Sequence, residues 1–197
     1  KATHLKHHAH TNDPDNDPAF FHGNAKNWWE AAVNVNVSYD DDGPALKAIQ
    51  KHVEEDPKFK EALEKGGAWA LLFYFAQIIL AVLYPLETLL LWWIPKRVAT
   101  SYLGIVFSYF PHSGLGKGRY KDTRFWTNKM PRFLNHSMQI HTMHHMYPRI
   151  CHYDEAKAIE ALKPFMIERG MPGAEYIPER LRWNPVTFIK EVYFGGR

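Results

Sequence analysis

The stretch from Trp69 to Ile94 constrains the fold of this 197-residue chain more than any other feature. It reads WALLFYFAQIILAVLYPLETLLLWWI, which is 26 residues with Glu87 as the single charge. A membrane-spanning helix needs about 20 apolar residues, and a buried helix of a soluble protein is rarely apolar on every face for so long. Between residues 68 and 110 the only ionisable side chains other than tyrosine are Glu87, Lys96 and Arg97. The sequence therefore predicts a membrane hairpin over residues 67–111.

Two positions are candidates for the turn of this hairpin. A turn at Pro85-Leu86-Glu87 gives two legs of similar length but leaves Lys96 and Arg97 at mid-depth in the second leg. A turn at Pro95-Lys96-Arg97 places these charges in a polar loop and shortens the second leg to residues 98–110. Charges at the bilayer centre cost several kcal/mol, which favours the second position. Either turn returns the chain to the side that it left.

Histidines on both sides of the hairpin repeat one spacing. HLKHHAH runs from His4 to His10 and HTMHHMYP from His141 to Pro148, and each contains histidines at positions i, i+3 and i+4. On a helix these positions lie at roughly 0°, 300° and 40°, so three imidazoles share one face. Imidazole is the commonest nitrogen ligand of transition metals. The spacing predicts two metal ions, or one dinuclear site closed between two helices, with the ligands His4, His7, His8, His141, His144 and His145.

Chance and a remnant of an affinity tag account poorly for these histidines. The chain has 12 histidines, so one such triple could arise by chance, but two independent triples are far rarer. A tag would account only for the first triple. Zinc is the other metal to consider, but the chain has no His-Glu-x-x-His motif and a single cysteine.

Further side chains near these motifs are candidates for the same site. His112 directly follows the second leg in Phe110-Pro111-His112, so we predict it as a ligand; the alternative is a histidine that caps the helix. Asp13, Asp15 and Asp17 could accept the second N–H of ligand imidazoles, although turn formation explains them equally well. His22 and His52 are expected at the surface. Residues expected to support the ligands without binding metal are His10, Asn135, His136 and His152.

The remaining chain predicts an all-α protein with a histidine-rich helical cap on one side of the membrane. Residues 1–66 form the segment with the first triple, and Pro44 to Lys65 is expected to be helical and divided at Pro57. Residues 112–169 carry the second triple. Helices are expected over Phe133 to Tyr147 and from Asp154 to a kink or end at Pro164. Residues 170–197 are rich in proline and glycine and are expected to form a loose tail.

The histidine motifs and the intervening hairpin resemble the integral-membrane fatty acid desaturase and hydroxylase superfamily over residues 1–165. The runs HLKHHAHTNDPDNDP, PHSGLGKGRYKDTR and HTMHHMYPRICHYDE look like its carotenoid-modifying and related bacterial branches. The resemblance implies a non-haem di-iron centre that uses O2 to oxidise C–H bonds of a long apolar lipid. A carotenoid-type substrate is favoured, a fatty acyl desaturase is the alternative, and a non-catalytic membrane metal-binding protein is a second alternative. The family's upstream histidine box does not precede His4, which suggests that the chain is truncated at its N-terminus.

The sequence also constrains the partners of such an enzyme. One cysteine cannot hold an iron–sulfur cluster, and no glycine-rich dinucleotide motif is present, so a separate electron donor such as a ferredoxin-type protein is implied. The basic stretch 117–132 could dock this donor, face anionic headgroups on the cytoplasmic side, or be solvated. The net charge of +3, without a long basic run, gives no indication of nucleic-acid binding. The histidine motifs are expected on the cytoplasmic side.

Overall fold

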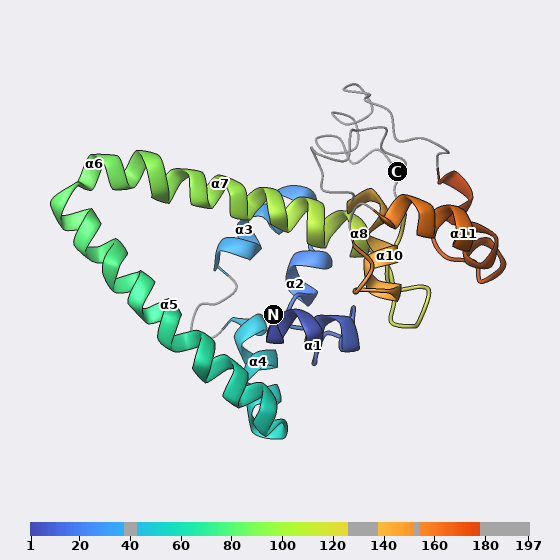
Figure 1. Cartoon of the computed structure of the whole chain (residues 1–197), viewed down its shortest axis with the longest axis horizontal. Coiled ribbons are helices and arrows are strands. Elements are labelled where there is room, and N and C mark those ends of the chain that lie inside the picture. Colours follow the sequence, from blue (N-terminus) through green and yellow to red (C-terminus); the bar gives the residue numbers. More distant parts are fainter. Residues whose placement is uncertain (38–42, 126–137, 152–153, 178–197) are drawn as a thin grey trace.

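The computed structural model describes residues 1–37, 43–125, 138–151 and 154–177. The described residues form helices and turns without strands. In Figure 1, α5 and the run from α6 to α8 form the two arms of a V, and the N-terminal helices lie toward its open end. The helices are α1 (Ala2–His10), α2 (Phe20–Gly23), α3 (Trp28–Val37), α4 (Pro44–Glu55), α5 (Pro57–Leu83), α6 (Pro85–Thr88), α7 (Ile94–Leu103), α8 (Phe110–His112), α10 (His141–Met146) and α11 (Glu155–Glu168).

The first arm is the long helix α5, which begins where the sequence predicts a division. Asp56 caps it by accepting hydrogen bonds from the backbone N–H groups of Lys58 and Phe59, and Pro57 occupies the first turn. Its apolar part is long enough to cross a membrane and lies unburied, and among the described helices it alone meets both criteria of length and composition. These exposed apolar side chains are what a lipid-facing helix requires.

The second arm is helical from Pro85 to His112, although it contains two further prolines. A π-helical segment precedes each of them: η1 (Leu89–Trp93) comes before Pro95, and η2 (Gly104–Tyr109) comes before Pro111. Proline lacks an N–H and clashes with the preceding turn, and a wider π turn accommodates both defects. The arm therefore continues through both prolines and delivers His112 to its far end.

The hairpin turns at Tyr84, so the prediction of a turn at Pro95-Lys96-Arg97 is wrong. The mid-leg charge of Arg97 that argued against the other turn is compensated within the fold. Its guanidinium donates hydrogen bonds to the backbone and side-chain oxygens of Asn36 at 3.1 and 3.2 Å, and it lies 5.3 Å from the Trp93 ring centroid. Arg97 thus neutralises the C-terminal end of α3, where helix carbonyls lack partners.

Helix α3 packs closely along the second arm. Gly104 makes this possible, since a Cβ there would lie 2.8 Å from Cγ1 of Val35 and 3.1 Å from the carbonyl oxygen of Ala31. Ser101 donates a hydrogen bond to the carbonyl of Ala32 and accepts one from the Asn36 amide. These contacts fix the N-terminal segment against the arm that carries His112.

Two histidines expected at the surface are buried, which corrects that prediction. His22, on α2, is 4% exposed, and His52, on α4, is 2% exposed. His52 bonds the carbonyl oxygen of Asn16 through Nε2 at 2.7 Å and stacks on His10 with the ring centroids 5.1 Å apart. Hydrophobic patterning could not reveal the burial of His52, because it results from a hydrogen bond between α4 and a turn distant in sequence.

The C-terminal part contains a small apolar core around α10 and α11. Helix α11 continues through Pro164 to Glu168, and Asp154 precedes it as predicted. Residues 170–177 return to the core, where Met171, Ala174 and Ile177 are buried, so the expectation of a loose tail is wrong for this stretch. Of the helix expected over Phe133 to Tyr147, the structure describes η3 (Met138–Ile140) and α10; residues 133–137 and 178–197 lie outside the described residues.

Candidate metal centre

The two histidine triples meet in space and form two groups with His112. One group contains His7, His112, His141 and His145, and the other contains His4, His8 and His144. Within each group the candidate ligand nitrogens all lie within 4.8 Å of one another. The groups adjoin, since the His8 and His145 rings stack with centroids 4.2 Å apart. The two triples thus lie together, as a dinuclear site closed between two helices requires, and His112 of α8 joins them.

Each triple is divided between the groups. On α1 the i and i+4 residues His4 and His8 join one group, whereas on α10 the i and i+4 residues His141 and His145 join the other. The i+3 residue lies about 60° to 100° away around each helix, so it contributes to the opposite group. The crossing of α1 and α10 therefore builds two sites from two identical spacings, which the spacing alone did not reveal.

The group of His4, His8 and His144 has the geometry of a set of metal ligands. The three Nε2 atoms form a nearly equilateral triangle with separations of 3.0, 3.1 and 3.1 Å. An ion bound at right angles by three imidazoles at about 2.1 Å would separate their nitrogens by about 3.0 Å. The residues therefore fit a metal that takes three ligands on one face and leaves positions open.

The group of His7, His112, His141 and His145 lies deeper. His7, His112 and His141 are 7%, 1% and 3% exposed, and the Nε2 atoms of His141 and His145 approach to 3.1 Å. Nε2 of His112 is buried without a hydrogen-bond partner among the described residues. A buried nitrogen lone pair directed at three other imidazoles fits a metal ligand better than a helix cap.

Three members of this deeper group are oriented through their other ring nitrogen. His7 donates from Nδ1 to Oδ1 of Asp17 at 2.8 Å, and His112 donates from Nδ1 to the carbonyl of Asp122 at 3.1 Å. The hydroxyl of Thr11 donates to the carbonyl of His7, so its oxygen can accept from Nδ1 of His145 at 3.3 Å. In each case Nε2 is left as the lone pair that faces the group, as metal-bound imidazoles require.

The pKa is lowered for six of the seven imidazoles, which favours their neutral form. Burial, with the nearby His144, lowers the pKa of His4 to about 4, and burial, with His4 and His144, lowers the pKa of His8 to about 3. Burial also holds the pKa values of His141 and His145 well below the usual value. Neutral imidazole is the metal-binding form, so at neutral pH these six imidazoles require no proton release before they bind a metal.

The other predicted site residues have mixed outcomes. Asp17 orients a ligand as expected, whereas Asp13 forms an ion pair with Lys117 at 2.8 Å. His10 lies outside both groups and stacks on His52. Asn135, His136 and His152 lie outside the described residues. Thr11 was missed in the sequence, because its hydrogen-bond partner His145 is over a hundred residues distant. Asp122 was also missed, because a backbone carbonyl has no side chain to recognise.

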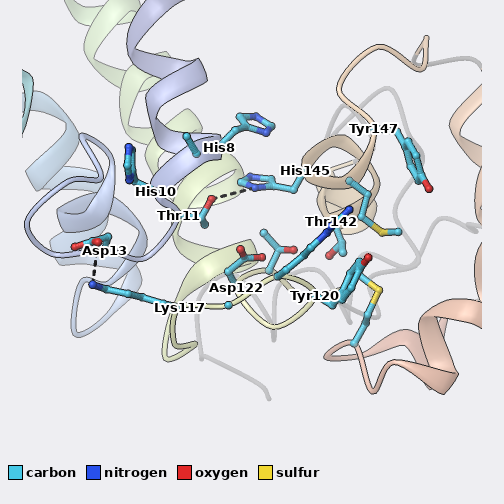
Figure 2. Close-up of a pocket in the computed structure, with 16 residues that line it drawn as sticks. His8, His10, Thr11, Asp13, Lys117, Tyr120, Asp122, Thr142, His145 and Tyr147 are labelled. Carbon is cyan, nitrogen blue, oxygen red and sulfur yellow. Dashed lines mark hydrogen bonds and ion pairs between the residues drawn. The ribbon is translucent and has the colours of Figure 1, made fainter. Parts of the chain in front are cut away.

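A pocket of about 480 Å³ lies beside the centre (Figure 2). His8 and His145, one from each group, line it together with Thr142 and Tyr147 of the second triple's segment. The loop after His112 contributes its basic residues Lys117 and Arg119 to the same pocket. The pocket therefore gives polar access from the surface to both groups.

Seven converging imidazoles beside an apolar hairpin form two adjoining groups that could each hold a metal ion. The fatty acid desaturase family model matches residues 1–176, and the chain belongs to this family of integral-membrane, O2-dependent di-iron oxidoreductases. No curated protein matches the chain. No solved structure matches it either.

Proposed function

We propose that His4, His7, His8, His112, His141, His144 and His145 hold the two iron ions of an enzyme that oxidises C–H bonds of a long apolar lipid. The observation that carries the proposal is the convergence of these histidines in two adjoining groups at the end of the apolar hairpin. When bound, the two ions would supply the activation of O2. The nitrogen ligands suit iron, and both groups, as far as the chain is described, consist of imidazoles without carboxylates, which favours iron over magnesium or calcium.

The chain's own residues supply orientation and electrostatics. Asp17, Thr11 and the carbonyl of Asp122 hold three imidazoles in the tautomer that directs Nε2 inward. Burial of His112 and His141 in the deeper group keeps these two imidazoles neutral. The hairpin would place the site at the membrane surface, where an apolar substrate can reach it from the bilayer.

For the substrate, we propose a fatty acyl chain as the first candidate and a carotenoid as the second. The family match supports the acyl chain. The run PHSGLGKGRYKDTR favours a carotenoid in the sequence, but three of its residues have contacts at or near the proposed metal site that involve no substrate. His112 is a proposed ligand, Lys117 pairs with Asp13, and Asp122 supports His112 through its carbonyl. These contacts explain the residues without reference to a substrate, so the run carries less information about it.

The proposed electron donor is a separate acidic protein that docks at the loop after His112. Lys117, Arg119 and Lys121 are exposed there, and the loop borders the pocket that reaches His8 and His145. Complementary charge would steer an acidic partner to this point and give a short path to both groups. The rest of the basic stretch, residues 126–132, lies outside the described residues.

The proposed side of the membrane can be tested with Cys151, which is exposed and follows the second triple. In sealed vesicles of known orientation, a membrane-impermeant thiol reagent should label Cys151 only when the cytoplasmic face is outward. A Cys151→Ala variant controls for other thiols. Labelling only from the opposite face would overturn the cytoplasmic placement of both triples.

The activity is tested by expression in two hosts, one that makes carotenoids and one that does not. Mass spectrometry of extracted lipids should show acyl chains that gain a double bond or a hydroxyl group in both hosts, and a His144→Ala variant should abolish the change. New oxygenated carotenoids with unchanged acyl chains would reverse the order of the two substrates. Bound iron with no oxidised lipid and no O2 consumption would favour the non-catalytic metal-binding protein.

A further inference from the structure

Asn12 occupies an unusual conformation between the first triple and the turns that follow it. Its φ is 60°, in the left-handed region that most residues avoid, and the residue is 4% exposed. Asparagine tolerates this region better than other non-glycine residues. Such a conformation costs energy and persists only where surrounding contacts hold it in place. The contacts of Asn12 therefore indicate why the fold keeps this conformation.

The backbone of Asn12 supports one ligand of the deeper group. Its N–H donates to Oδ2 of Asp17 at 2.9 Å, and the other carboxylate oxygen of Asp17 accepts from Nδ1 of His7 at 2.8 Å. The left-handed turn at residue 12 therefore directs a donor at the carboxylate that orients His7.

The side chain of Asn12 supports a second ligand from a distant segment. Its Nδ2 donates to the carbonyl of Asp122 at 2.9 Å, and the same carbonyl accepts from Nδ1 of His112 at 3.1 Å. Its Oδ1 accepts a hydrogen bond from Nδ2 of Asn24 at 3.1 Å, which fixes the orientation of the amide. One residue thus connects the supports of His7 and His112.

We propose that Asn12 is a positioning residue that couples the orientations of His7 and His112. This inference rests on the proposed function, because it assigns both histidines to one metal ion. The carbonyl of Asp122 belongs to the loop after His112, and the Asn12 amide ties that carbonyl to the end of α1. Without the amide, the carbonyl would no longer be held where it fixes the tautomer and ring orientation of His112.

The coupling predicts a selective loss of metal. Removing a partner that orients a metal ligand typically lowers metal affinity by about 10–100-fold. The hydrogen bonds of Asn12 lead to the deeper group, whereas the nitrogens of His4, His8 and His144 converge through the spacing of α1 and the position of α10. A variant that lacks the amide should therefore lose iron from the deeper group and keep it in the other.

The test uses Asn12→Gly, Asn12→Ala and the control Asn16→Gly in the protein purified in detergent. Glycine keeps the left-handed backbone and its N–H but removes the amide, whereas alanine also disfavours the backbone conformation. Asn16→Gly removes an amide from the same turns, one that bonds Asp13 and supports no proposed ligand. Iron content is measured after equilibration with increasing chelator, and thermal unfolding is measured for the metal-free proteins.

We expect Asn12→Gly to release one of its two iron ions, about half of the total, early in the chelator titration. The chelator concentration needed for this release should be about 10–100-fold lower than for the wild type and for Asn16→Gly. Its metal-free unfolding temperature should match that of Asn16→Gly. Retention of iron by Asn12→Gly with loss by Asn12→Ala would show that only the backbone conformation matters and would overturn the role of the amide. Equal loss from both groups would overturn the selectivity. A wild type that binds neither iron nor added Co²⁺ would instead overturn the metal centre itself.

Discussion

The two groups of histidines share one residue type and the same two helices, yet they are held in different ways. In the group of His4, His8 and His144, the Nε2 atoms approach one another within a single triangle. In the group of His7, His112, His141 and His145, three imidazoles are fixed by partners outside the triples. The first group needs only the spacing of His4 and His8 on α1 and the position of His144 on α10. The second group also depends on hydrogen bonds from residues outside the triples.

This difference implies different sensitivities. The deeper group should bind its ion more tightly and lose it when any of several supporting residues changes. The shallower group should respond only to its own ligands. Variants that lose one ion and keep the other therefore test this difference between the two groups.

The largest effect is expected for His112→Ala. The change removes a buried imidazole, a proposed ligand, and leaves three imidazoles in the deeper group, so about half of the iron and nearly all turnover should be lost together. The loss of affinity should exceed the roughly 10–100-fold that follows removal of a supporting partner. Iron per protein and product formation are measured on the same sample. If His112 only caps its helix, thermal stability falls, while the iron-to-protein ratio and turnover stay near the wild-type values.

Asp17→Asn should have the next largest effect. The carboxylate accepts hydrogen bonds from His7, from the N–H of Asn12 and from the N–H of Ala19, and it is 2% exposed. The amide keeps the shape but replaces one acceptor oxygen with a donor, so affinity for the deeper ion should fall by about 10–100-fold. A chelator titration should show one early and one unchanged step of iron release. Early release of both ions would mean that the groups are not independent.

These residues also show which features of the fold and the site could be predicted from the sequence. The spacing of the triples and the order of the chain predicted which seven histidines converge, and the composition predicted the long apolar helix and the all-helical character of the described residues. Spacing did not predict the division of each triple, because that depends on how α1 and α10 cross. Thr11 and Asn12 could not be found, because a hydrogen bond between residues over a hundred positions apart has no local pattern, and the backbone carbonyl of Asp122 has no side chain to recognise. The turn at Tyr84 was missed because the compensation of Arg97 by Asn36 is likewise long-range.

Acidification should weaken the metal-free protein within a defined range. The pKa values of His4 and His8 are lowered to about 4 and about 3, whereas the unfolded chain protonates near 6.5. The unfolded state then binds more protons than the folded state between about pH 6.5 and 4, so stability falls as the pH falls through this range. Unfolding temperatures should be nearly constant from about pH 7 to 8 and decline below about 6.5. A His4→Asn variant should decline less steeply, and an unchanged slope would contradict the lowered pKa of that imidazole.

Gly23→Ala should affect the deeper group slightly. A Cβ at Gly23 would lie 3.0 Å from Cβ of His112 and 3.4 Å from the carbonyl of Ser108, so His112 must shift by a few tenths of an ångström. Overpacking of this kind costs about 1–3 kcal/mol, and part of that cost should appear as weaker binding of the deeper ion. Gly67→Ala is the matched control, because a Cβ there meets nothing within 4 Å. Equal chelator midpoints for the two variants would show that His112 tolerates the displacement.

The smallest effect is expected for His10→Ala, although His10 belongs to the same histidine-rich run as three proposed ligands. The residue lies outside both groups, and its ring stacks on His52 at 5.1 Å. The stacking joins α1 to α4, so its removal should lower the unfolding temperature by a few degrees, as the loss of about 1 kcal/mol would. Iron content should be unchanged, because neither group loses a ligand or a supporting hydrogen bond. Both quantities can be measured beside His8→Ala, which removes a ligand from the same helix. If His10→Ala lost as much iron as His8→Ala, His10 would belong to the metal site, and its assignment outside both groups would be wrong.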